Sequence, residues 1–155
     1  MAVSAWETEV SRVSKILEST GDDALSKETA PGRNSGHYLL GHLVAVSDGM
    51  LALLGWEERS LKDLDAPFLT SAEKAGLPRP SLSTLREQWK TINVKISSHI
   101  QKMSADDWFN RHTAVSEADF AKEPHRNKLN LLINRTIHMS YHRGQLIYLT
   151  KKADD

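Results

Sequence analysis

The sequence predicts an all-α fold, a four-helix bundle, for a single domain of residues 1–155. Four stretches carry apolar residues at the three- and four-residue spacing of an amphipathic helix. No stretch has the alternation of apolar and polar residues that is typical of a half-buried strand. Four helices of roughly 15 to 25 residues in one domain favour a bundle, in which each helix buries its apolar face.

The first helix is expected from Ser4 to about Gly21. Ser4 and Glu7 have the spacing of a capping box, in which both side chains accept hydrogen bonds from free amides of the first turn. The face expected to be buried carries Trp6, Val10, Val13 and Leu17.

The second helix is expected to begin near Asn34 or Ser35. Its apolar positions follow a helical spacing and are Leu39, Leu43, Val46, Met50 and Leu53. Gly55 stands where helices commonly end with a residue in the left-handed conformation, so the helix is expected to stop just before it.

The third helix follows Pro80 and Ser81 and has the longest unbroken apolar stripe, made of Leu82, Leu85, Trp89, Ile92, Ile96, Ile100 and Met103. The fourth helix is expected from about Arg126 to Lys151. Its apolar residues go nearly all the way round, which predicts a helix buried on several sides. They are Leu129, Leu132, Ile133, Ile137, Met139, Leu146, Ile147 and Tyr148.

Three polar connections, 22–33, 56–80 and 104–125, are long for a compact domain. Connections of this length tend to be functional lids or to contain short helices. Ser104 to Trp108 has the composition of one such helical turn.

The composition disfavours several classes of function. Twenty basic residues balance twenty acidic ones, so we expect neither nucleic acid nor an anionic membrane surface as a partner. No apolar run reaches the length of about 18 residues that spans a membrane, and no signal peptide is recognisable, which favours the cytoplasm. The absence of cysteine means that thiol chemistry would need a small-molecule thiol.

Two histidines of the fourth helix, His138 and His142, are four residues apart. This spacing places both imidazoles over one patch of the helix, as in helices that bind one metal ion. Two core histidines that bind no metal can have the same spacing, so the pair alone leaves both interpretations open. Asn134, Arg135 and Gln145 flank the pair, as in a polar pocket within a bundle core.

A third histidine, His42, lies beside the apolar stripe of the second helix. At the helical rise, His42 lies about 10 Å from the start of its helix, and His142 about 13 Å from the end of the fourth. The three rings therefore fall at nearly one level if the two helices run antiparallel. They fit less well if the helices run parallel.

The other histidines are weaker candidates. His37 lies about 140° round the helix from His42, so both cannot face one ion. His99 borders the stripe of the third helix, where it is either a fourth ligand or, as we expect, a core residue. His112 and His125 lie in connections and are expected to be exposed.

Two segments, NSGHYLLGHL at 34–43 and HMSYHRGQL at 138–146, resemble the DinB-like superfamily of metal-binding four-helix bundles. The order of parts agrees over nearly the whole chain, and the H-R-G-Q ending is more specific than the bare histidine pair. The resemblance implies up-down-down-up connectivity, with residues 56–80 as a long crossover between helices two and three. It also implies that His42, His138 and His142 bind one nickel or zinc ion, and that the chain forms a homodimer.

Some members of that superfamily are thiol S-transferases or isomerases that use bacillithiol or mycothiol, and many have no assigned reaction. The resemblance therefore implies a metal-dependent transfer of a low-molecular-weight thiol to a small electrophile. A tryptophan that often precedes the first histidine is missing here, and Tyr38 stands four residues ahead of His42 instead.

Three imidazole ligands leave at least one position open for water or substrate. Tyr38, Asn134 and Gln145 are candidates to orient the rings and the ligand. The last helix has no Asp or Glu between Glu123 and Asp154, which disfavours a hydrolase with a glutamate beside its metal. Two alternatives to a transferase stay open, namely a non-catalytic metal-binding or dimeric stress-response bundle and a metal-dependent hydrolase.

Two further residues carry expectations about packing. Gly144 costs roughly 0.5–1 kcal/mol relative to alanine within a helix, so we expect it to let a neighbouring helix approach closely. Trp56 lies outside every apolar stripe. It either contributes to a dimer contact or covers the end of the bundle, folded back onto residues 60–78.

Overall fold

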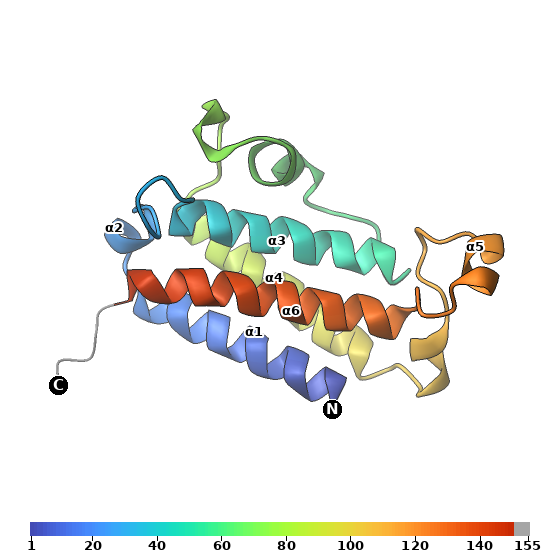
Figure 1. Ribbon diagram of the computed structural model, residues 1–155. Helices are drawn as coiled ribbons and strands as arrows, with labels where there is room; N and C mark the ends of the chain where they lie inside the picture. Colours follow the sequence, from blue (N-terminus) through green and yellow to red (C-terminus); the bar gives the residue numbers. More distant parts are fainter. Residues whose placement is uncertain (151–155) are drawn as a thin grey trace.

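Four long helices form the body of the molecule, and they lie side by side in Figure 1. The computed structural model describes residues 1–150. The long helices are α1 (Ala2–Ser19), α3 (Gly36–Leu53), α4 (Leu82–Ile100) and α6 (Lys128–Leu146). Within residues 1–150 there is no strand, only isolated bridges between Glu28 and Ser35 and between Arg111 and Asn127. The prediction of an all-α fold is confirmed.

Short helices occupy the three long connections. They are α2 (Asp22–Leu25), η1 (Lys62–Leu64), η2 (Ala66–Thr70), η3 (Glu73–Ala75), η4 (Asp106–Phe109) and α5 (Glu117–Lys122). A further short helix, η5 (Ile147–Leu149), directly follows α6. The turn predicted near Trp108 is thus present as η4. The predicted end of the fourth helix, Lys151, lies outside the described residues.

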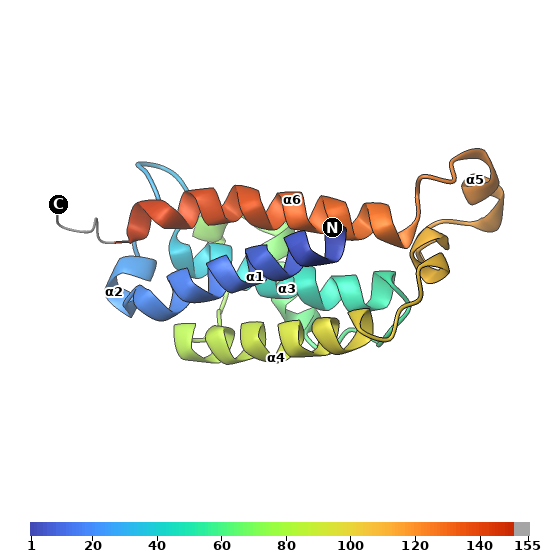
Figure 2. The same cartoon turned by 90° about the horizontal axis from the view of Figure 1, so that it is seen from below.

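Each long helix contacts two neighbours. The most extensive contacts join α1 to α6 and α3 to α4, and smaller ones join α1 to α4 and α3 to α6. In Figure 2, α4 and α6 lie on opposite sides, with α1 and α3 between them. Every helix in this part of the chain is too short or too polar to span a membrane.

Three of the long helices start at a polar residue whose side chain accepts a backbone hydrogen bond, as predicted for a capped end. These residues are Ser35, Ser81 and Asn127. The predicted capping box of Ser4 and Glu7 is wrong, because α1 already begins at Ala2 and has no side-chain cap. Ala2 and Val3 pack against the core, which favours a helix that starts earlier.

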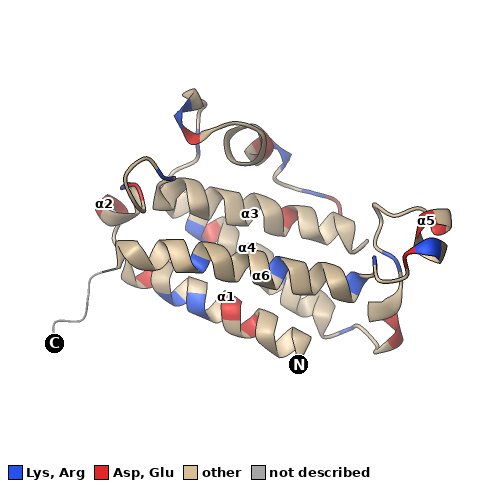
Figure 3. Cartoon of the chain, viewed as in Figure 1, with Lys and Arg blue, Asp and Glu red and all other residues tan. Residues whose placement is uncertain are grey.

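The helix that is buried on several sides is α3, not α6. Its buried residues include consecutive ones, such as Leu43, Val44 and Ala45, which face different sides of the helix. The reason is that α4, α6 and the crossover all cover α3. Its one charged residue is Asp48, which is fully buried. Figure 3 shows α3 with no Lys or Arg. By contrast, α6 buries only Leu132, Met139 and Leu146.

The outward face of α6 is therefore apolar and open. Ile137 and Tyr141 are 62% and 64% exposed, and Tyr148, in η5 just after α6, is 77% exposed. Gly144 lies on the same helix, and a methyl group added there would meet nothing within 4 Å. The expectation that Gly144 allows close approach of a helix within the chain is wrong.

The crossover between α3 and α4 is held against α3 by two contacts. Asp48 accepts hydrogen bonds from Arg59 Nε, at 3.2 Å, and from the amides of Ser60 and Leu61. The buried ring of Phe68, in η2, lies where Gly41 leaves room for it, since a Cβ at Gly41 would be 2.3 Å from a ring carbon. The crossover is thereby fixed beside α3 at the level of His42.

Candidate metal centre

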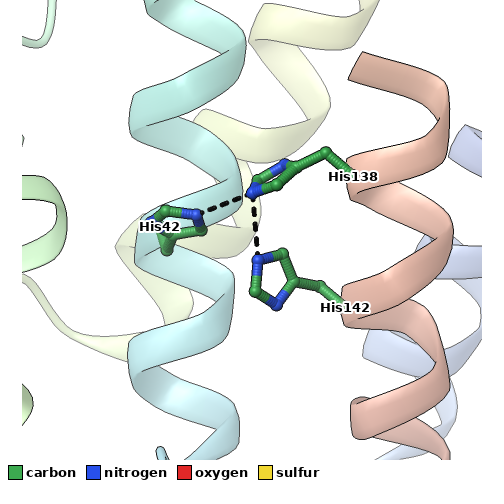
Figure 4. Close-up of side chains that lie close together, drawn as sticks. All are labelled: His42, His138 and His142. Carbon is green, nitrogen blue, oxygen red and sulfur yellow. Dashed lines mark hydrogen bonds between the residues drawn. The ribbon is translucent and has the colours of Figure 1, made fainter. Parts of the chain in front are cut away.

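Three histidines meet between α3 and α6 (Figure 4). His138 Nε2 lies 3.0 Å from His42 Nε2 and 3.0 Å from His142 Nε2. One ligand nitrogen from each of the three lies within 4.8 Å of the others. The structure thus brings together the three residues that the spacing and level arguments selected.

The relative direction of the two helices explains why the rings meet. The first turn of α3 lies against the end of the α6 segment, since a Cβ at Gly36 would be 2.6 Å from Leu149 Cδ1. His42 therefore falls level with the pair on α6, as the antiparallel arrangement required. Arg143, next to His142, is paired with the buried Glu9 of α1 at 2.7 Å, which fixes α6 on its other side.

The outer ring nitrogens of two histidines have defined partners. His42 Nδ1 donates to the carbonyl oxygen of Phe68 at 2.9 Å, and His142 Nδ1 donates to Gln145 Oε1 at 2.7 Å. Because Nδ1 carries the hydrogen in both rings, Nε2 of each neutral ring presents its lone pair to the centre. Hydrogen bonds of this kind commonly orient metal-bound histidines.

The surroundings keep the imidazoles neutral. Burial lowers the pKa of His42, His138 and His142 below the ordinary value, and the shift takes the pKa of His138 to about 4. The other imidazoles and the Arg135 guanidinium lower the pKa of His138 further. Neutral imidazole is the form that binds metal ions, so all three rings are available near neutral pH.

The donor set fits a divalent ion. A nitrogen has one hydrogen or one lone pair, so His138 Nε2 cannot satisfy two neighbouring lone pairs with two straight hydrogen bonds. A shared cation satisfies all three. Zinc bonds of about 2.0–2.1 Å in tetrahedral geometry place two ligand nitrogens about 3.3 Å apart, close to the 3.0 Å that separates His138 Nε2 from Nε2 of each of the other two histidines.

The three residues expected to orient the site differ in their positions. Gln145 contacts a ring directly, as described above, and its amide donates to the Tyr141 hydroxyl at 3.4 Å. The Tyr38 ring lies parallel to His42 with centroids 6.4 Å apart, and its hydroxyl donates to the Ser71 carbonyl. Asn134 is exposed and donates to Asn130 at 3.2 Å, so it does not orient a ring of the triad.

The remaining histidines lie elsewhere. His99 stacks on Trp56 with ring centroids 5.1 Å apart, and its Nε2 is 2.9 Å from Glu57, so it is not a fourth ligand. Trp56 also contacts Trp108 edge to face, at the end of the bundle. His112 was expected to be exposed, but it is half-buried and its Nδ1 is buried without a partner.

Two features of the site escaped the sequence reasoning. The acceptor for His42 is a backbone carbonyl of Phe68, in the irregular crossover, and no residue type identifies such an atom in advance. The one hint in the sequence is Gly41, because a glycine inside a helix can mark a place where another segment packs closely against it. The sequence places Arg135 only as a neighbour of the pair, yet it is half-buried and its charge lowers the pKa of His42 and His138.

No protein-family model and no curated protein matches the chain.

Proposed function

We propose that this protein binds one divalent metal ion through Nε2 of His42, His138 and His142. Zinc and nickel are the ions we expect, since both accept imidazole ligands. The observation that carries this proposal is the convergence of three neutral ring nitrogens, two of them oriented by hydrogen bonds from the opposite side of the ring.

The proposal includes membership of the DinB-like superfamily, with up-down-down-up connectivity of α1, α3, α4 and α6. Two contacts support this connectivity. His37 Nε2 contacts the Pro80 carbonyl oxygen at 2.9 Å, which joins the first turns of α3 and α4. The first turn of α3 also lies beside the end of α6, so that α3 and α6 run in opposite directions.

The reaction we propose is the transfer of a low-molecular-weight thiol to a small electrophile. A divalent ion held by three histidines would supply a Lewis acid with an open position for a thiolate. The chain has no cysteine, so the thiol must come from a small molecule. Within residues 1–150, no Asp or Glu joins the histidine group, which favours thiol transfer over hydrolysis by a glutamate base.

We also propose that two copies of the chain associate through the outward face of α6. The exposed Ile137 and Tyr141 offer apolar surface there, and Gly144 leaves the helix backbone accessible to a partner. An isologous two-fold contact is the commonest way to close such an interface. Trp56 is not needed for it, because Trp56 packs within its own chain.

The first experiment is metal analysis of protein purified without a polyhistidine tag. The proposal predicts about one zinc or nickel ion per chain for the wild type and almost none for His138→Ala. His99→Ala is a matched control, because it removes a histidine outside the triad and should keep the ion.

A second experiment tests the reaction. Metal-loaded protein is incubated with a panel of small electrophiles and with bacillithiol, mycothiol or glutathione, and conjugates are measured by mass spectrometry. Conjugation that requires both the metal and His138 supports thiol transfer. Full metal occupancy without turnover of any pair would favour a non-catalytic metal-binding bundle instead.

A further inference from the structure

A cavity of about 10 Å³ adjoins the histidine triad on the side toward the N-terminal end of α6. Its lining includes Trp6, Ser47, Arg135 and His138. Arg135 precedes His138 by three residues, so both side chains project from neighbouring turns of one helix. A volume of this size accommodates about one water molecule.

Two of the residues that line this cavity each have a buried N–H group without an acceptor. Trp6 is 1% exposed, and its Nε1 has no hydrogen-bond partner. The Nε atom of Arg135 is also buried without a partner. Buried donors are normally paired in folded proteins, so two of them beside one cavity indicate that an acceptor belongs there.

Arg135 also lacks a compensating charge. In the described part of the chain, no carboxylate forms an ion pair with it, and burial alone lowers the pKa of its guanidinium. The titratable groups around it are basic or neutral, since its charge acts on His42, His138 and His112. The other guanidinium that acts on His112, that of Arg126, is paired with Glu123.

A half-buried guanidinium with no anion is costly, and a divalent ion on the triad would add positive charge beside it. The unpaired guanidinium and the proposed ion would both favour an anionic ligand. A guanidinium has a planar fork of donors that matches a carboxylate or a phosphate group better than a spherical anion.

We propose that Arg135 binds an oxyanion, the carboxylate or phosphate group of the small molecule that the triad acts on. Arg135 is then a positioning residue, which holds the charged end of the ligand close to the three histidines. One water in the cavity accepts hydrogen bonds from Trp6 Nε1 and Arg135 Nε, and the terminal nitrogens of the guanidinium bind the oxyanion. This inference deepens the proposed function and rests on it for the role of the triad.

The test measures thermal unfolding of the untagged protein with increasing acetate or phosphate, at ionic strength kept constant with chloride. Each series is recorded for metal-free and for zinc-loaded protein. Acetate represents a carboxylate ligand and phosphate represents a phosphate ligand. At a probe concentration ten times the dissociation constant, binding shifts the folding equilibrium about elevenfold toward the native state.

Three variants define the outcome. Arg135→Met should abolish the rise in melting temperature, and Arg135→Lys, which keeps the charge but not the fork, should weaken it. Arg33→Met, which removes an exposed charge from a loop, should keep the full response. If Arg135→Met does not fold, two other measurements decide the question. One is the response of Arg135→Lys, which should be weaker than that of the wild type. The other is direct calorimetric titration of the wild type with phosphate and acetate.

Two results would overturn the inference: a wild type that responds to neither anion, or an Arg135→Met protein that responds as the wild type does. Zinc content is measured separately in every sample. An anion response that depends on Arg135 in protein unable to bind zinc would refute the metal proposal alone. Zinc binding without an anion response would refute the role of Arg135 alone.

Discussion

Replacing Gly41 with alanine should damage both the stability and the metal affinity of the protein. The new methyl group would lie 2.3 Å from a ring carbon of Phe68. Carbon atoms in contact are about 3.5–4.0 Å apart, so the ring must retreat by more than about 1 Å. Phe68 is fully buried in η2, and its carbonyl oxygen holds His42 Nδ1 at 2.9 Å. The displaced segment therefore carries the acceptor away from His42.

Two magnitudes follow from this displacement. Overpacking of a well-filled core costs about 1–3 kcal/mol of unfolding free energy. Loss of a hydrogen-bonded partner of a metal-binding histidine commonly lowers metal affinity about 10–100-fold. Urea unfolding of the metal-free protein measures the first quantity, and competition with a chromophoric zinc chelator measures the second.

Gly49→Ala is the matched control for this experiment. Gly49 lies in the same helix, and a Cβ there meets only Arg59 Nε, at 3.8 Å. The control should gain about 0.5–1 kcal/mol, as expected for alanine within a helix, and should keep its zinc affinity. If Gly41→Ala behaves like Gly49→Ala in both assays, the crossover does not position His42 through the Phe68 carbonyl oxygen.

Three further predictions concern the site and the assembly. Gln145→Leu should weaken zinc binding about 10–100-fold with little loss of stability, because the acceptor for His142 Nδ1 is removed; unchanged affinity in chelator competition would contradict this. Metal-free protein should lose stability as the pH falls from about 6.5 to about 4, because the unfolded chain takes up protons before His138 does. In urea unfolding, His138→Leu should reduce this dependence of the unfolding free energy on pH. A variant whose stability falls as steeply with pH as that of the wild type would contradict the burial of a neutral His138 ring. Sedimentation at micromolar concentration should give a dimer for the wild type and for Trp56→Ala. Ile137→Glu should give a 17.4 kDa monomer. A monomeric wild type would rule out the proposed dimer.

Helical periodicity predicted the long helices well, but not how many neighbours each one has. The third helix starts at Ser81 as predicted, because a capping serine after a proline is a local signal. The apolar residues of α6 go nearly all the way round, yet Ile137 is 62% exposed. A pattern of side chains gives the faces of a helix that can be buried, and tertiary packing decides which of them are.

The three histidines were predictable because helical geometry is regular. Spacing places His138 and His142 on one face, and the rise per residue places His42 at their level. The acceptor at Phe68 was not predictable in the same way, because it is a backbone atom in an irregular segment. Its position depends on tertiary contacts of the crossover with α3, such as the packing of Phe68 over Gly41 and the hydrogen bonds from Arg59 and Ser60 to Asp48.

The most direct test of the metal centre is a crystal structure of the zinc-loaded, untagged protein with anomalous diffraction measured at the zinc edge. We predict one anomalous peak per chain, at about 2.0–2.1 Å from Nε2 of each of His42, His138 and His142. A map without a peak between α3 and α6, or with zinc bound only at other residues, would contradict the proposed function.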